Sequence, residues 1–200
     1  MITIASIVEG DGEVSALPVL LRRLASEQEP VALIKLLPPI RVRRDKFINR
    51  DNEFRRQLLL AAAKSGDDGW ILIVLDADDD CPANLGQQIY ERAQQHIPHR
   101  RLSVVLANRE FEAWFIAAAH SLQGVRGFSL AADEHMQAEE PRNAKDWMRK
   151  HMQSGTYSEI LDQPAFAARI DLQQAFKNSR SFRKLYKEWQ THILSRIEFA

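Results

Sequence analysis

The sequence predicts an α/β fold: a doubly wound, parallel sheet of about four strands with a helical C-terminal appendage. Two observations lead to this prediction. Short, apolar, β-branched segments alternate with longer segments whose apolar residues recur at helical spacing. The short segments are apolar at nearly every position, which is typical of parallel strands that helices cover on both faces. Crossovers in such sheets are right-handed, and ligands bind beyond the carboxyl ends of the strands.

The elements follow one another in the order β-α-β-α-β-α-β-α. The expected strands are residues 2–8, 31–37, 70–75 and 102–106. The expected helices are residues 13–25, 52–64, 82–96 and 110–120.

Most of these boundaries have a local chemical reason. Pro38 and Pro39 close the second strand, because proline cannot donate a hydrogen bond to the sheet. Gly66 follows the second helix and Pro98 follows the third, at positions typical of helix ends. Pro18 is expected in the first turn or so of the first helix, where proline is tolerated.

The pattern changes after residue 120. Residues 121–141 are irregular, and residues 142–200 have helical patterning. We interpret residues 1–120 as the α/β domain and 121–200 as a helical extension that packs on the same domain. The reason is size, since a separate unit of fewer than about 80 residues has a marginal core.

Composition excludes several classes of protein. The chain has 200 residues, of which 45% are hydrophobic and 27% charged, as in an ordinary globular domain. The 27 basic and 27 acidic residues balance, which excludes a uniformly basic nucleic-acid coat but not a local basic face. Cys81 is the only cysteine, so a disulfide scaffold is excluded. No apolar run approaches the roughly 20 residues that span a bilayer. No basic leader precedes an apolar N-terminal segment, so we expect a cytoplasmic protein with no membrane partner.

Acidic residues follow three of the four expected strands. They are Glu9, Asp11 and Glu13 after the first, Asp76, Asp78, Asp79 and Asp80 after the third, and Glu110 and Glu112 after the fourth. The carboxyl ends of parallel strands meet at one edge of a sheet, so these acids should converge there. Like charges repel unless a cation neutralises them. Carboxylates suit hard divalent cations such as Mg²⁺, Mn²⁺ or Ca²⁺.

Each acidic group also has a purely structural interpretation. Asp11 and Glu13 suit the positive end of a helix dipole, and Asp79 and Asp80 suit a helix cap. Asp76, however, directly follows an apolar strand, as Glu9 does, where an uncompensated carboxylate costs several kcal/mol to bury. Taken together, the three groups favour a metal site.

The motifs resemble those of the Toprim domain, which occurs in topoisomerases, bacterial primases and nucleases of the overcoming-lysogenization-defect (OLD) family. An apolar strand ending in Glu9 and Gly10 matches the first Toprim motif. A later apolar strand ending in Asp76, Asp78 and Asp80 matches the second, Asp-x-Asp-x-Asp. The resemblance covers about residues 1–120 and implies a Toprim/Rossmann-like sheet.

A closer resemblance extends over the whole chain. Val8-Glu9-Gly10 with Glu13, residues 109–114 (REFEAW) and residues 179–182 (SRSF) resemble a stand-alone bacterial Toprim-like family, domain of unknown function 4276. Its members often lie beside ATPase genes, in settings that suggest phage defence. The chain has no Walker motif, so the resemblance implies a separately encoded ATPase as partner.

The resemblance to Toprim nucleases implies a site for one or two Mg²⁺ ions, for which Mn²⁺ can substitute. Asp76 and Asp78 would be metal ligands, and Asp80 a ligand of a second ion. Glu9 would be a ligand or a general acid/base. Glu9, Asp76 and Asp78 are therefore the expected catalytic residues. Glu13 resembles the second acid of the Glu-Gly-x-x-Glu pattern in OLD-type nucleases.

The same resemblance implies that Glu110 or Glu112 completes a second metal site. Residues two apart point to different faces of a helix, so we expect one of the two to face the metals. We favour Glu110, which is nearer the strand. OLD-type enzymes also tend to carry a basic residue near the second metal, and Arg109 and Lys145 are the candidates here.

A basic segment follows the second strand. It contains Arg41, Arg43, Arg44 and Lys46, which we interpret as a loop on the same edge of the sheet as the acids. With Arg109, these residues are the expected nucleic-acid contacts, because cations attract the phosphate backbone toward the metal. The alternative is a solvated helix face with pairs within the helix.

The sequence thus predicts a Mg²⁺-dependent, phosphodiester-cleaving nuclease or nuclease subunit, acting on nucleic acid in phage defence with a partner ATPase. The alternative is a non-catalytic, metal-binding Toprim module that docks on a partner ATPase and regulates it. A phosphatase of the haloacid-dehalogenase type is disfavoured. In that fold the acidic strand comes first, whereas Asp76 follows the third strand.

Overall fold

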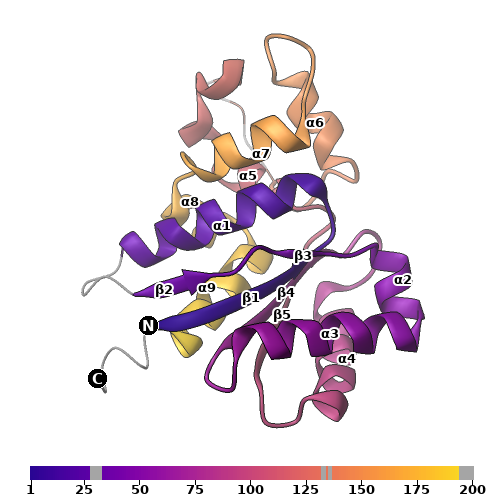
Figure 1. Cartoon of the computed structure of the whole chain (residues 1–200). Helices are drawn as coiled ribbons and strands as arrows, with labels where there is room; N and C mark the ends of the chain where they lie inside the picture. The colour runs from indigo at the N-terminus through magenta and orange to yellow at the C-terminus, as the bar shows by residue number, and fades with distance from the viewer. Residues whose placement is uncertain (28–32, 132–133, 135–136, 194–200) are drawn as a thin grey trace.

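The structure is a computed structural model that describes residues 1–27, 33–131, 134 and 137–193. It confirms the α/β fold with a parallel sheet (Figure 1). The strands are β1 (Ile2–Val8), β2 (Ile34–Leu36), β3 (Ile40–Arg41), β4 (Trp70–Asp76) and β5 (Arg101–Ala107). In the described part of the chain the α-helices are α1 (Asp11–Ser26), α2 (Arg44–Asn49), α3 (Asp51–Ser65), α4 (Pro82–His96), α5 (Glu112–Ala117), α6 (Ala144–Lys150), α7 (Glu159–Ala167), α8 (Leu172–Asn178) and α9 (Arg180–His192). Two 3₁₀ helices span Ala119–Leu122 and Val125–Gly127.

The sheet has the order β2-β1-β4-β5, and β3 also pairs with β1. All of these pairs are parallel. The sheet has five strands rather than the expected four because Pro38 and Pro39 interrupt the second strand instead of closing it. β2 pairs with the start of β1, and β3 pairs with its end at Ile7 and Val8. Val31 and Ala32, the first residues of the expected second strand, lie outside the described residues.

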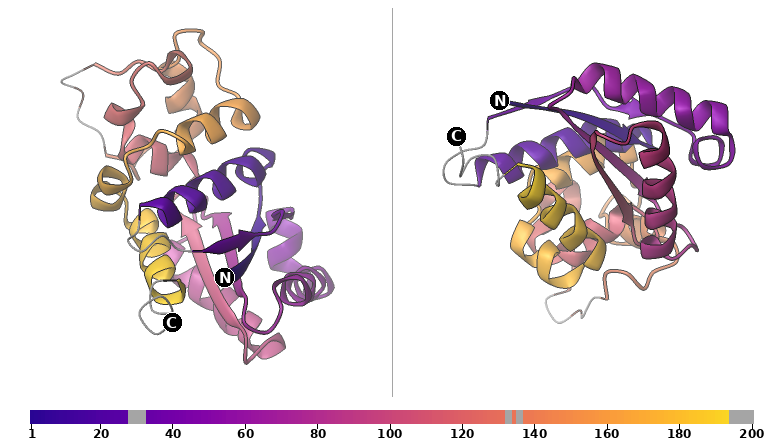
Figure 2. Two further views of the ribbon diagram at one scale, coloured as in Figure 1. Left: turned by 60° about the vertical axis from the view of Figure 1, so that its left-hand side comes forward. Right: turned by 90° about the horizontal axis from the view of Figure 1, so that it is seen from below.

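Helices cover both faces of the sheet (Figure 2). Alternate side chains of β1 show why, since Ile4 joins one hydrophobic cluster and Ala5 the other. One cluster contains α1, α5 and the C-terminal helices, and the other contains α2, α3 and α4. Figure 1 shows α1 and α7 on one side of the sheet and α3 and α4 on the other.

Three expectations about helices need correction. The segment that contains Arg44 and Lys46 is helix α2, not a loop; Phe47 explains this, because its fully buried ring anchors α2 against Phe54 of α3. The fourth expected helix is shorter, because α5 ends at Ala117 and a 3₁₀ turn follows. Pro18 lies inside α1 rather than in its first turn, because α1 begins at Asp11.

The C-terminal helices complete the core of the α/β sheet. Helix α7 packs along α1, and α9 packs on β5. The first contact depends on Gly12, where a Cβ atom would lie 2.6 Å from the carbonyl oxygen of Glu159 in α7. Trp70 of β4 and Trp189 of α9 belong to one hydrophobic cluster, with ring centroids 6.2 Å apart. The division at residue 120 remains a prediction.

None of the described helices combines the length and the apolar character that crossing a membrane requires.

Candidate functional site

The carboxyl ends of β1 and β4 form the centre of the site. These two strands are neighbours at the middle of the sheet. From this point the chain adds β2 on the outer side of β1 and β5 on the outer side of β4. In open parallel sheets such a switch point is the usual ligand position. Glu9 follows the last residue of β1, and Asp76 is the last residue of β4.

Four acidic side chains meet at this point, and we call them the carboxylate cluster: Glu9, Glu13, Asp76 and Glu112. Glu9 is partly buried, and the other three are at most 7% exposed. Burial raises the pKa of each, because water no longer stabilises the charged form. The negative charges of Glu13, Glu112 and Glu9 raise the pKa of Asp76 further. The pKa of Glu13 rises to about 7.

Hydrogen bonds hold two members of the cluster in place. One carboxylate oxygen of Glu13 accepts from the backbone N–H groups of Glu9 and Gly10, at 3.0 and 2.9 Å. One oxygen of Glu112 accepts from the hydroxyl of Tyr157 at 2.9 Å and the amide of Gln163 at 2.8 Å. The cluster is therefore attached both to the start of α1 and to the α7 region.

Three oxygens of the cluster are buried without a hydrogen-bond partner among the described residues. They are Glu9 Oε2, Asp76 Oδ1 and Glu112 Oε2. Unpartnered buried oxygens are uncommon in native proteins, and each requires an explanation.

The positive charge of Lys145 in α6 acts on three members of the cluster, because it lowers the pKa values of Glu9, Asp76 and Glu112 against the effect of burial. Burial acts to lower the pKa of Lys145 itself, but the charges of Glu112, Glu159 and Asp76 outweigh burial and raise the pKa above its usual range. Its ammonium group lies 3.2 Å from a carboxylate oxygen of Glu159. Lys145 therefore supplies positive charge to the cluster from within the chain.

The structure brings Glu112 into the carboxylate cluster and turns Glu110, the favoured candidate, away from it; which of the two binds a metal stays a prediction. The side chain of Glu110 turns toward α6, where its Oε2 accepts from the backbone N–H of Lys145 at 3.0 Å. Glu112, which is fully buried, faces Asp76 instead. The physical reason is that α5 begins only at Glu112, so Glu110 lies in the preceding turn and not on the same helix.

A cavity of about 360 Å³ opens beside the cluster. Its acidic wall contains Glu9, Glu13 and Asp76, with Lys145 beside them. Arg41, Arg43 and Arg44 of the basic segment also line this cavity. The structure therefore brings these three expected nucleic-acid contacts to the cavity that the acids line.

Arg44 has a structural role in addition to its place in that cavity. It donates to the carbonyl oxygens of Asp76 and Ala77, at 2.9 and 3.2 Å. It also forms ion pairs with Asp78 at 3.3 Å and Asp80 at 2.6 Å. Helix α2 is thus clamped to the loop that follows β4.

The other predicted residues lie at the margin of the site. Asp78 is near enough to raise the pKa of Glu9 but is exposed, and Asp80 is also exposed. Arg109 pairs with Asp79 at 2.6 Å. Neither Arg109 nor Lys46 lines the cavity.

Within the described ranges, no group of three or more His, Cys, Asp or Glu side chains can hold a metal ion as positioned here. The chemistry of the cluster nevertheless fits a metal ion. Carboxylate oxygens are the preferred ligands of Mg²⁺, and three carboxylate oxygens of the cluster lack a hydrogen-bond partner. Metal binding would require these side chains to turn toward one another.

Sequence reasoning missed Tyr157 and Gln163, the two residues that hold Glu112. They lie 45 and 51 positions from it along the chain, in a segment with no recognisable motif. Only the packing of the α7 region against α1 and α5 brings them to the site.

Comparison with known proteins gives one match. No curated protein and no solved structure matches the sequence significantly. The model of one family, described as "Domain of unknown function (DUF4276)", matches residues 8–189. This range includes the carboxylate cluster, Lys145 and nearly all of α9, and the chain therefore belongs to the DUF4276 family.

Proposed function

We propose that this protein is a Mg²⁺-dependent nuclease, or the nuclease subunit of a larger assembly, that cleaves phosphodiester bonds in nucleic acid. The observation that supports the proposal is a single cavity that is lined both by Glu9, Glu13 and Asp76 of the carboxylate cluster and by arginines of the basic segment. Phosphodiester cleavage needs carboxylates for a cation and positive charge for the phosphate backbone. The Glu-Gly and Asp-x-Asp-x-Asp motifs, which resemble those of Toprim nucleases, agree with this chemistry.

Glu9, Asp76 and Glu112 are the residues that would hold the metal, because each has a buried oxygen without a partner. Asp78, at the exposed margin beside Glu9, is the next candidate ligand. When bound, Mg²⁺ or Mn²⁺ polarises the scissile phosphate and lowers the pKa of an attacking water.

The remaining residues bind and orient the substrate. Arg41 and Arg43 are exposed on the cavity wall, where they can contact phosphates on either side of the cleaved bond. Lys145 can place its ammonium group beside the reacting phosphate, because Glu110 holds its backbone. Arg44 keeps the loop after β4 in position through its contacts with Asp76 and Asp80.

Asp76→Asn tests the proposal directly. Calorimetry with Mg²⁺ and with Mn²⁺ should show binding to the wild type and at least a tenfold loss of affinity in the variant. A nicking assay on supercoiled plasmid, with a parallel assay on single-stranded RNA, should show cleavage that the variant loses. Asp79→Asn is the matched control, because Asp79 is exposed in the same loop and pairs with Arg109 outside the cavity.

The outcomes separate the possibilities. Metal binding and cleavage that are both lost only in Asp76→Asn support the nuclease. Metal binding without cleavage of either substrate contradicts an enzyme that is active alone and directs the search to a partner. Wild-type protein that binds neither metal contradicts the metal site itself.

A second proposal is a non-catalytic Toprim-like module that docks on a separately encoded ATPase and regulates it. The position of Lys145 favours it, since this lysine neutralises part of the cluster without a metal. Such a module would keep its affinity for the ATPase in Asp76→Asn. Either function would operate in the cytoplasm, and phage defence is the setting that the resemblance suggests.

A further inference from the structure

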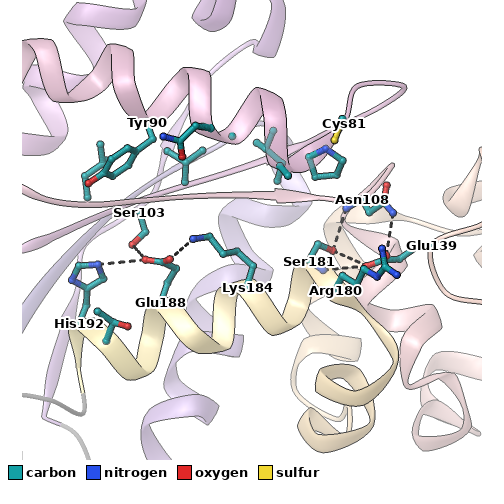
Figure 3. A pocket seen from close by; sticks show the side chains of 18 residues that line it. Cys81, Tyr90, Ser103, Asn108, Glu139, Arg180, Ser181, Lys184, Glu188 and His192 are labelled. Atoms are coloured by element: carbon teal, nitrogen blue, oxygen red, sulfur yellow. Dashed lines mark hydrogen bonds and ion pairs between the residues drawn. The ribbon is translucent and has the colours of Figure 1, made fainter.

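A second cavity, of about 780 Å³, runs along the edge strand β5 between α4 and α9 (Figure 3). It shares no lining residue with the cavity beside the carboxylate cluster. Its size is within the usual range for binding sites. None of the residues that line it has a role in the proposed nuclease site.

The floor of this groove is the unpaired edge of β5. Among the described residues, β5 pairs with β4 alone. The carbonyl oxygen of Ala107 accepts from Ala77, so Ala107 turns toward β4, as do the residues two and four positions before it. The N–H and C=O groups of Leu102, Val104 and Leu106 therefore point outward into the groove. The N–H of Asn108 agrees with this alternation, because it donates outward to Ser181 of α9.

The two walls differ in chemistry. The α4 wall is mainly apolar: Pro82, Gly86 and Tyr90 line the groove there, and Leu102, Val104 and Leu106 of β5 line it as well. The α9 wall is polar and contains Arg180, Ser181, Lys184, Glu188 and His192. An extended chain laid along β5 would direct alternate side chains to the two walls.

Three basic side chains among the described residues line the groove, and Lys184 and His192 both pair with Glu188. Glu188 accepts from Ser103 and Lys184, and Glu139 accepts from Asn108 at 3.1 Å. Both acids are therefore occupied. Arg180, exposed beside Asn108, forms no ion pair with any residue in the described ranges. An occupant with a carboxylate at this end of the groove would complement it.

Gly86 lines the groove on the α4 side and leaves space there. It lies inside α4, where glycine is less favourable than alanine. A Cβ atom at this position would meet nothing nearer than Leu106 Cγ, at 3.9 Å. The packing of the chain therefore does not require a glycine here, and a larger side chain at this position would occupy space in the groove.

We propose that this groove binds an extended peptide segment of a partner protein, which adds to β5 as a further strand. Apolar side chains at alternate positions of the peptide face α4, and a carboxylate of the peptide lies beside Arg180. A second copy of this chain is disfavoured, because its own α4 and α9 flank its edge strand and would collide with the same helices here.

A library of random eight-residue peptides displayed on phage is the probe for the test. Peptides selected on the wild type should alternate apolar and polar residues and carry an acidic residue near one end. Gly86→Leu, which fills the groove, should weaken their binding at least tenfold. Gln88→Leu is the matched control, because Gln88 is exposed on the same helix and does not line the groove. Tyr90→Glu provides a second blocking variant, which places a charge in the apolar wall.

Amide chemical shifts give a readout that is independent of the variants. A bound peptide should shift the amide signals of Leu102, Val104 and Leu106 more than those of Ser103 and Val105, whose N–H groups face β4. Failure to enrich any peptide on the wild type relative to Gly86→Leu would overturn the proposal. So would binding that survives in both blocking variants. A wild type that is dimeric by sedimentation, with a monomeric Gly86→Leu variant, would also overturn it and identify a second copy as the occupant.

Discussion

Lys145 shows how a single residue makes the carboxylate cluster possible. Buried carboxylates destabilise a fold unless charge or hydrogen bonds compensate them. Lys145 reaches Glu112 and Asp76 from α6, and Glu110 holds its backbone in place. The ammonium group thus offsets part of the repulsion when no metal is bound.

Replacing this lysine should expose that repulsion. We expect Lys145→Gln to lower the melting temperature by several degrees at pH 8 and by less at pH 5. At the lower pH, the carboxyl groups with raised pKa take up protons, and the missing cation matters less. Differential scanning calorimetry at the two pH values measures the difference. Lys150→Gln is the control, since Lys150 is exposed on the same helix and pairs with Asp146; equal effects of both variants would contradict the role of Lys145.

The stability of the fold should depend on pH through Glu188 of α9, which lies on the opposite face of the sheet from α4. Burial acts to raise its pKa, but hydrogen bonds from His192, Lys184 and Ser103 outweigh burial and lower it to about 2. Its carboxylate therefore stabilises the fold above its unfolded pKa of 4.5, and this stabilisation is lost as the pH falls toward 2.

Glu188→Gln should accordingly reduce the unfolding free energy at pH 7 by at most about 3 kcal/mol. The difference from the wild type should shrink between pH 5 and pH 2.5. Urea unfolding at several pH values measures it, with Glu91→Gln as a control at an exposed position of α4. If the difference in unfolding free energy stays constant over this pH range, the hydrogen bonds to Glu188 do not depend on the negative charge of its carboxylate.

At the scale of secondary-structure elements, the break between β2 and β3 positions the basic segment. Pro38 and Pro39 interrupt the second strand, and β3 resumes beside the end of β1. Arg41 is consequently carried to the same edge as Glu9, and its guanidinium pairs with Asp11 at 3.0 Å. The short helix α2 then places Arg44 over the loop after β4.

Helix α1 lacks one backbone hydrogen bond near its centre. Pro18 lies inside the helix, so it cannot donate to the carbonyl oxygen of Val14 four residues earlier. We expect Pro18→Ala to raise the unfolding free energy by about 1–2 kcal/mol, because it restores this donor in a partly exposed position. Urea unfolding measures the change. A loss of stability would mean that the packing of the proline ring outweighs the missing hydrogen bond.

At the scale of the whole molecule, the C-terminal helices complete the core and the site together. Helix α7 covers α1, and the α7 region supplies Tyr157 and Gln163 to Glu112. Helix α9 covers β5, and its Ser181 accepts a hydrogen bond from Trp114 of α5 at 2.9 Å. Residues beyond 120 therefore supply most of one of the two helical layers that cover the sheet.

A fragment of residues 1–120 should fail to fold cooperatively for this reason. Buried aromatic residues such as Trp114 and Phe115 would lose their partners Phe182 and Phe166. We expect strong binding of a hydrophobic dye, no near-ultraviolet circular dichroism and no sharp thermal transition. The whole chain is the control. A fragment that unfolds cooperatively with native circular dichroism would establish residues 1–120 as an independent domain.

The sequence by itself determined the α/β class, the parallel sheet and the acidic ends of β1 and β4. These features depend on local patterns: apolar runs of strand length, helical spacing, and charged residues directly after a strand. The expected bounds of β1 and α4 agree with the structure for the same reason. The role of Asp76 and Glu9 as a metal site stays a prediction.

Only the tertiary structure decided which acids meet. Glu110 and Glu112 differ by two positions, and the start of α5 turns the first toward α6 and the second into the cluster. Lys145, Tyr157 and Gln163 join the site through packing between segments far apart in the chain, which no local pattern encodes. Long-range packing also places α4 and α9 on the two faces of β5, and no strand in the described part of the chain pairs with its outer edge.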